Sequence, residues 1–184
     1  MTNRISLPTL LTWMRIALVP FFVGVYYVPD YLLSMVHKNF LATAIFLFAA
    51  ITDYFDGYLA RKMKMETNFG AFLDPVADKA LVAASLVVLV SLNRTFVFAA
   101  IIIIVREIAI SALREWMAKV GETQGVAVAY IGKLKTTCQM TAISFLLLDY
   151  STNFIGNLFM LVAVVLTVVS MFYYLDQAKK YFNT

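Results

Sequence analysis

The chain is poor in the residues that build disulfides and zinc sites. Its 184 residues include one cysteine, Cys138, and one histidine, His37. A single cysteine excludes an intrachain disulfide, so no disulfide framework stabilises the fold. The cysteine and the histidine lie far apart in the sequence and form no ligand cluster, which argues against zinc. We therefore expect any bound metal to have oxygen ligands.

Charged residues are also scarce. Asp, Glu, Lys and Arg make up 14% of the chain, whereas hydrophobic side chains make up 62%. Soluble domains carry about 25% charged residues, so this composition predicts an integral membrane protein. The chain has a net charge of +4. In a membrane protein, basic residues interact with anionic lipid and determine topology, so this charge does not by itself indicate nucleic-acid binding. We expect membrane lipid around the chain, and no nucleic-acid partner.

Six apolar segments predict an all-α, polytopic protein with six transmembrane helices. They cover about residues 8–28, 40–60, 72–92, 95–116, 134–149 and 154–175. Each is close to the roughly 20 residues that cross a bilayer, although the fifth is short. Because proline is tolerated in the first helical turn or at a kink, Pro75 predicts that the third helix begins near Asp74.

The remaining sequence is compatible with one membrane domain over residues 1–184. Residues 4–7 form a short amphipathic stretch that we expect to lie at the membrane interface. The first apolar segment lacks a small-residue cleavage site, so we interpret it as a retained helix. No internal repeat, long linker or large extramembrane segment interrupts the chain.

Basic residues predict the orientation of these helices. One set of ends carries Arg4, Arg61, Lys62, Lys64, Lys119, Lys133, Lys135, Lys179 and Lys180, and the other carries Lys38 and Arg94. Positive charge accumulates on the cytoplasmic side of membrane proteins. We therefore expect both termini in the cytoplasm.

Four aspartates stand in this apolar background. Asp53 and Asp56 are three residues apart, and Asp74 and Asp78 are four apart, so each pair would share one face of a helix. An aspartate near the centre of a membrane helix costs about 2.5–3.5 kcal/mol, which calls for a neutralising cation. Carboxylates suit Mg²⁺ or Mn²⁺, and four negative charges favour two such ions. On the predicted topology the aspartates lie near the cytoplasmic surface.

The spacing around these aspartates resembles the signature of the CDP-alcohol phosphotransferase family. Eight specified positions match across 26 residues: Asp53, Asp56, Gly57, Ala60, Arg61, Gly70, Asp74 and Asp78. The resemblance implies that the four aspartates hold the metal ions and that Asp78 also removes the proton of the attacking hydroxyl. It further implies that CDP-diacylglycerol is bound by Asp53, Asp56, Gly57, Ala60, Arg61, Gly70 and Asp74.

Longer stretches are similar to the bacterial members that accept sn-glycerol 3-phosphate. They comprise residues 7–12 with Arg15, residues 67–70 and 73–79, residues 106–108 with Arg114, and residues 132–137 with Gln139. This similarity implies transfer of phosphatidyl from CDP-diacylglycerol to glycerol 3-phosphate with release of CMP, a step of phosphatidylglycerol and cardiolipin synthesis. It also implies a homodimer in the bacterial inner membrane, with the active site facing the cytoplasm.

A phosphorylated acceptor requires a basic pocket. Arg106 and Arg114 are eight residues apart and would lie on nearly one face of the fourth helix. Lys133 and Lys135 would stand at the head of the fifth helix. We expect these four residues to bind the glycerol phosphate. The alternative is that Arg106 pairs with Glu107 or a motif aspartate and that the lysines are topology signals.

Other functions stay open from the residues alone. The same chemistry could serve phosphatidylglycerol, inositol phosphate or serine as the acceptor, although neutral serine would not need so basic a pocket. An ion-coupled transporter also places acids in membrane helices. It predicts acids near the bilayer midplane and inverted repeats, neither of which the sequence indicates.

Overall fold

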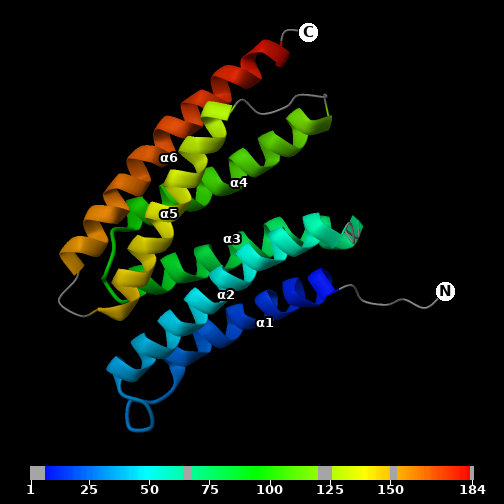
Figure 1. Ribbon diagram of the computed structural model, residues 1–184. Coiled ribbons are helices and arrows are strands. Elements are labelled where there is room, and N and C mark those ends of the chain that lie inside the picture. Colours follow the sequence, from blue (N-terminus) through cyan, green and yellow to red (C-terminus); the bar gives the residue numbers. More distant parts are fainter. Residues whose placement is uncertain (1–6, 64–67, 120–125, 150–152, 183–184) are drawn as a thin grey trace. The chain divides into compact units, whose positions relative to one another are not determined.

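The chain folds into α-helices, as its apolar segments predicted. The computed structural model describes residues 7–63, 68–119, 126–149 and 153–182, and no strand occurs within these ranges. The helices are α1 (Leu7–Tyr27), α2 (Met35–Met63), α3 (Asn68–Ser91), α4 (Val97–Lys119), α5 (Val126–Leu148) and α6 (Asn153–Phe182) (Figure 1). The all-α class is confirmed.

Two predicted helix starts were wrong. α3 begins at Asn68, so Pro75 lies inside the helix and not in its first turn. Proline has no backbone N–H for the helical hydrogen bond, but membrane helices tolerate it where neighbouring groups satisfy the freed carbonyl. α5 begins at Val126, so Lys133 and Lys135 lie well within it. A lysine side chain has a long aliphatic stem, so a lysine can lie within an apolar helix and still extend its ammonium to a polar group.

The chain forms two compact units, Met1–Val88 and Leu89–Thr184. The first contains α1, α2 and most of α3, and the second contains α4, α5 and α6. Whether the two act as one domain over residues 1–184 stays a prediction.

In the first unit, α1 packs against α2. Phe22 of α1 and Phe46 of α2 are fully buried, and so is Ala42. A turn that contains Pro29 joins the two helices, with the Leu32 amide donating to the Pro29 carbonyl at 3.0 Å. Next to this turn, the buried Lys38 pairs with Asp30 at 2.6 Å. The turn is thus held by contacts among its own residues and with the start of α2.

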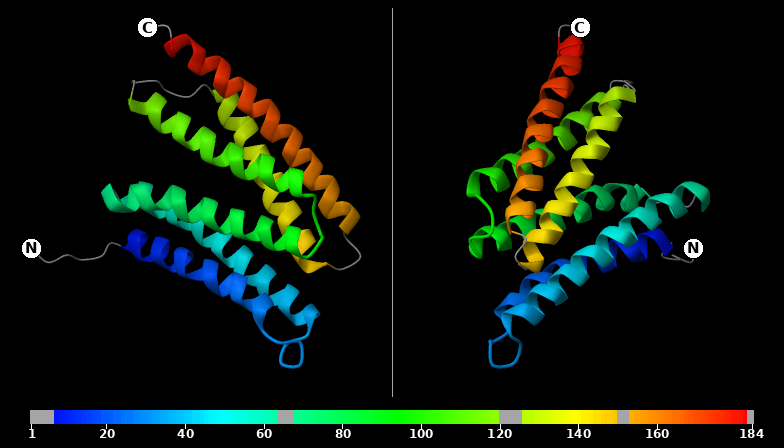
Figure 2. Two further views of the ribbon diagram at one scale, coloured as in Figure 1. Left: turned by 180° about the vertical axis from the view of Figure 1, so that it is seen from behind. Right: turned by 60° about the vertical axis from the view of Figure 1, so that its left-hand side comes forward.

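In the second unit, α5 and α6 run side by side in opposite directions, and α4 packs against α6 (Figures 1 and 2). The backbones of the hairpin approach closely at Gly156, where an added Cβ would lie 2.8 Å from the Leu146 side chain. Phe145 and Phe159 stack nearby with ring centroids 6.3 Å apart. The glycine and the stacked rings therefore allow α5 and α6 to pack closely.

One arginine binds the end of α5 in this hairpin. The buried Arg94, in the turn before α4, donates from Nη1 to the Leu147 carbonyl at 2.9 Å. Its Nη2 pairs with Asp149 at 3.0 Å. Asp149 has a φ of 52°, the left-handed conformation that often ends a helix. A cation at a helix C-terminus also offsets the negative end of the helix dipole.

Two helical segments are long and apolar enough to cross a membrane by length and composition. They are Met35–Thr52 of α2 and Asn153–Asp176 of α6. Shorter apolar segments occur at Thr12–Tyr27 and Lys79–Ser91. α4 and α5 carry the charged residues of the predicted acceptor pocket. The prediction of six membrane-spanning helices therefore remains a proposal.

Candidate functional site

The four motif aspartates lie on two helices of the chain. Asp53 and Asp56 are in the C-terminal half of α2, and Asp74 and Asp78 are in α3. Both pairs lie in helices, and residues three or four positions apart share one helix face. The two positions of each pair therefore lie on one face, as expected. The side chains of the eight signature positions lie outside the part of the chain whose side chains the structure describes. Among the side chains that it does describe, no group of three or more His, Cys, Asp or Glu could hold a metal ion.

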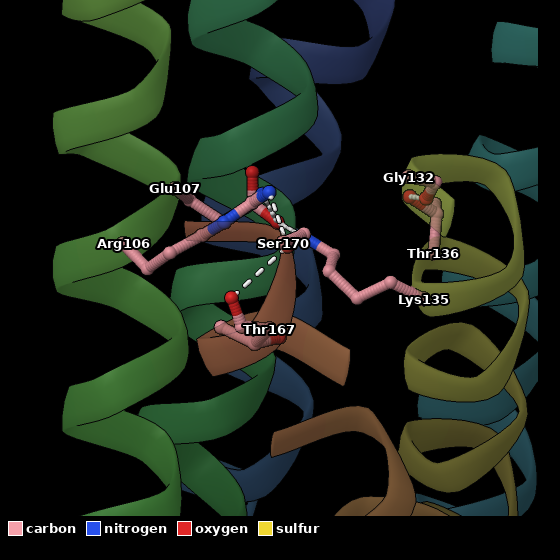
Figure 3. A network of polar contacts seen from close by, with 7 residues as sticks. All are labelled: Arg106, Glu107, Gly132, Lys135, Thr136, Thr167 and Ser170. Carbon is pink, nitrogen blue, oxygen red and sulfur yellow. Dashed lines mark hydrogen bonds and ion pairs between the residues drawn. The ribbon is translucent and has the colours of Figure 1, made fainter. Parts of the chain in front are cut away.

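A second polar cluster forms inside the helical unit of residues 89–184. Arg106 and Glu107 come from α4 and Lys135 comes from α5 (Figure 3). Arg106 is only 5% exposed and Lys135 only 2% exposed. Buried cations require partners, since isolated charges are strongly disfavoured away from water. The packing of α4, α5 and α6 therefore has to supply compensating groups.

Glu107 supplies the negative charge. The Lys135 ammonium donates a hydrogen bond to Oε1 of Glu107, and Nη1 of Arg106 lies 3.8 Å from the same oxygen. The pairing of Arg106 with Glu107, one part of the alternative, is thus observed, and the other part, that the lysines are topology signals, stays a prediction. The pairing does not exclude a substrate role, because an ammonium has three donors and a guanidinium has five.

Helix α6 holds Arg106 from the other side. Nη2 of Arg106 donates to the Ser170 hydroxyl at 2.8 Å. Ser170 in turn donates to the Thr167 carbonyl at 3.0 Å. The guanidinium carbon lies 5.8 Å from the centre of the Tyr174 ring, within the range of a cation–π interaction. These contacts fix the guanidinium against α6.

The cluster keeps unused hydrogen-bonding groups. Nε of Arg106 and Oγ1 of Thr167 are buried without a partner among the described residues. An unsatisfied buried polar group costs about 1–3 kcal/mol. Such groups are suited to contact a polar ligand.

Two of the four predicted acceptor residues meet in this cluster, and a third lies near it. Arg114 is exposed on α4, and its charge is close enough to act on Arg106 and Lys135. Lys133 is exposed on α5, and no contact joins it to the described residues of the cluster. The structure therefore brings together Arg106, Lys135 and the charge of Arg114.

Sequence reasoning missed the contribution of α6. Ser170 and Tyr174 were not among the predicted site residues, and the role of Glu107 was left undecided. A weak signal existed, because Thr167 and Ser170 are polar residues three positions apart in an apolar run. That spacing places them on one helix face, but it does not identify the helix that this face contacts.

Comparison with known proteins shows which family the chain resembles. Residues 5–169 match the sequence model of CDP-alcohol phosphatidyltransferase. A protein of Pectobacterium atrosepticum is 48% identical over 180 residues, which cover 96% of each chain. Proteins of Haemophilus influenzae and Escherichia coli are each 47% identical over 96% of this chain and over 95% and 96% of their own. All three relatives carry the name CDP-diacylglycerol–glycerol-3-phosphate 3-phosphatidyltransferase.

Proposed function

Because the chain belongs to the CDP-alcohol phosphatidyltransferase family, we propose that it transfers phosphatidyl from CDP-diacylglycerol to sn-glycerol 3-phosphate. The products are phosphatidylglycerophosphate and CMP, which places the reaction in phosphatidylglycerol and cardiolipin synthesis. The observation that carries this proposal is the 48% identity to a relative of that name across 96% of both chains. The basic cluster of α4 and α5 supports a phosphorylated acceptor.

The donor set of the signature fits divalent metal ions. Four carboxylates without a nearby thiol or imidazole in the motif suit Mg²⁺ or Mn²⁺, and Asp53, Asp56, Asp74 and Asp78 would hold two of them. When bound, such ions neutralise the diphosphate and the leaving CMP. Asp78 would accept the proton of the primary hydroxyl of glycerol phosphate. That oxygen forms a bond to the phosphorus that carries diacylglycerol, and the bond from this phosphorus to CMP breaks.

The remaining signature residues would bind the nucleotide lipid. Arg61 offers a planar fork of donors for the diphosphate or the CMP phosphate. Gly57, Ala60 and Gly70 are small, so the nucleotide can approach the helix backbone closely. Together with Asp53, Asp56 and Asp74 they form the proposed CDP-diacylglycerol site.

The acceptor would be held by its phosphate. Arg106, Arg114, Lys133 and Lys135 are the proposed glycerol 3-phosphate residues, and the closeness of three of them supports this assignment. Charge-assisted bonds to phosphate are among the stronger hydrogen bonds in proteins. Serine carries no phosphate and does not require such a site. Inositol phosphate and phosphatidylglycerol would also interact with it, so the acceptor has to be tested.

The setting of the reaction is proposed to be the bacterial inner membrane. Six spanning helices with both termini and the active site on the cytoplasmic side agree with the distribution of basic residues. Many large apolar side chains of α2 and α6 are exposed, among them Phe40, Phe48, Phe154 and Phe172, as expected for lipid contact. A homodimer is proposed from family resemblance alone.

The test is an acceptor panel with the purified full-length protein in detergent. CMP release from CDP-diacylglycerol with Mg²⁺ is measured separately with glycerol 3-phosphate, inositol phosphate, phosphatidylglycerol and serine. Release with glycerol 3-phosphate, and phosphatidylglycerophosphate as the lipid product, is the expected result. Release only with another acceptor would refute the substrate assignment. No CMP release with any acceptor would refute the proposed enzyme activity and favour the transporter alternative.

A further inference from the structure

Glu107 occupies a central position in the basic cluster. A single carboxylate oxygen, Oε1, accepts the hydrogen bond of the Lys135 ammonium and lies 3.8 Å from Nη1 of Arg106. These contacts join two helices, since Glu107 and Arg106 are on α4 and Lys135 is on α5. Figure 3 shows the Lys135 side chain reaching across from α5 to this carboxylate.

The two cations depend on Glu107 to different degrees. Arg106 is also held by Ser170 and by the Tyr174 ring. Lys135 has no other hydrogen bond or ion pair within the described part of the chain. A lysine side chain is flexible and ends in a point charge, so its ammonium is placed largely by its partner. Loss of the Glu107 carboxylate would leave the two buried cations repelling each other.

The charge of the cluster matches a phosphomonoester. Arg106 and Lys135 of the cluster and the nearby Arg114 contribute three positive charges, and Glu107 lowers the net charge to two. A phosphomonoester carries between about −1.5 and −2 at neutral pH. Two donors of the Lys135 ammonium and Nε of Arg106 are not used by the described residues. The cluster thus has both the charge and the free donors for a terminal phosphate.

We infer that Glu107 is a positioning residue of the acceptor-phosphate site, whose carboxylate fixes the Lys135 ammonium beside the Arg106 guanidinium so that both cations face one phosphomonoester. The inference rests on the proposed function and assigns a role to a residue outside the family signature. Glu107 itself would not contact the phosphate, since two anions would repel.

A purely structural ion pair makes a different prediction. Breaking a buried pair leaves an uncompensated charge and lowers stability, but it would change the kinetics of both substrates alike. A positioning role instead affects the acceptor selectively. The ratio of the KM changes for the two substrates therefore separates the two roles.

The experiment is a double-mutant cycle on the full-length protein in detergent. Initial rates of CMP release are measured for the wild type, Glu107→Gln, Lys135→Gln and the double variant, with glycerol 3-phosphate and CDP-diacylglycerol varied in turn. Loss of a hydrogen bond between charged groups predicts that Glu107→Gln raises the KM for glycerol 3-phosphate roughly tenfold or more. The KM for CDP-diacylglycerol should stay within about twofold. The double variant should resemble Lys135→Gln, because Glu107 acts through that lysine.

Two further variants control for folding and for net charge. Glu107→Asp keeps the charge on a shorter side chain and should raise the acceptor KM less than Glu107→Gln does; it also tests the inference if Glu107→Gln does not fold. Asp176→Asn removes one negative charge from an exposed position of α6 and should leave both KM values unchanged.

The outcomes separate the inference from the proposed function. An unchanged or lower acceptor KM in Glu107→Gln, equal changes for both substrates, or additive effects in the double variant would each overturn the role of Glu107 and leave the enzyme activity in place. A wild type that releases no CMP with glycerol 3-phosphate would refute the proposed function, and the positioning role would fall with it.

Discussion

The guanidinium of Arg106 on α4 donates to the hydroxyl of Ser170 on α6 at 2.8 Å, across 64 positions of the sequence. This contact fixes a buried cation of the proposed acceptor site against a helix that has no residue in the family signature. We therefore predict that α6 contributes to the proposed acceptor site.

Replacement of Ser170 tests this contact. Ser170→Ala removes the acceptor of the Nη2 hydrogen bond, so we expect the KM for glycerol 3-phosphate to rise about three- to tenfold while the KM for CDP-diacylglycerol changes little. Ser144→Ala is the matched control, because among the described residues the Ser144 hydroxyl donates only to the Met140 carbonyl of its own helix. Similar kinetics in both variants would show that Ser170 does not act on the acceptor site.

The basic residues should differ in importance. Lys135 is buried in the cluster whereas Lys133 is exposed, so Lys135→Gln should raise the KM for glycerol 3-phosphate by more than Lys133→Gln does. Arg114→Gln should also raise it more than the KM for the lipid. Initial-rate kinetics with each substrate varied provide the measurement. Equal effects on both substrates would contradict the assignment of these residues to the acceptor phosphate.

The close approach of α5 and α6 predicts a stability effect. In Gly156→Ala the new Cβ would lie 2.8 Å from Leu146, and relief of such overpacking typically costs about 1–3 kcal/mol. We expect a lower midpoint of thermal unfolding in detergent. Gly24→Ala in α1 is the control, because no atom lies within 4 Å of its added Cβ. An unchanged midpoint in Gly156→Ala would mean that the hairpin adjusts without cost.

Two variants near the turn before α4 should differ in thermal stability. Arg94→Met loses both the Leu147 carbonyl bond and the Asp149 ion pair, so it should lower the thermal midpoint more than Asp149→Asn, in which the carbonyl bond remains. A buried hydrogen bond that involves a charge contributes about 1.5–3 kcal/mol. The KM values should not change. Greater destabilisation by Asp149→Asn would show that the ion pair dominates.

The sequence predicted the helical class and the order of the elements because long apolar runs specify helices directly. It predicted the start of α3 incorrectly from Pro75, since a local propensity can be overridden by helix packing. The family was predicted from eight fixed positions and is confirmed by a match over residues 5–169. The roles of Asp53, Asp56, Asp74 and Asp78 stay predictions.

The candidate acceptor site was predicted only in part. The spacing of Arg106 and Arg114 indicated one helix face, and α5 was expected to add Lys135. The roles of Glu107, Ser170 and Tyr174 depend on which faces of α4, α5 and α6 meet, and helical periodicity within one segment carries no information on its partner. Such contacts between distant segments require the folded structure.

In the proposed reaction, Asp78 of the signature acts as the general base of a metal-dependent transfer to glycerol 3-phosphate. The most direct measurement is CMP release by the wild type and by Asp78→Asn, each at saturating CDP-diacylglycerol and glycerol 3-phosphate, with Mg²⁺ and after its removal by a chelator. We expect wild-type release that stops without the metal, and a kcat lowered about 10²- to 10⁴-fold in a folded Asp78→Asn variant, as for loss of a general base. Release that persists without divalent metal, or that is undiminished in Asp78→Asn, would contradict the account.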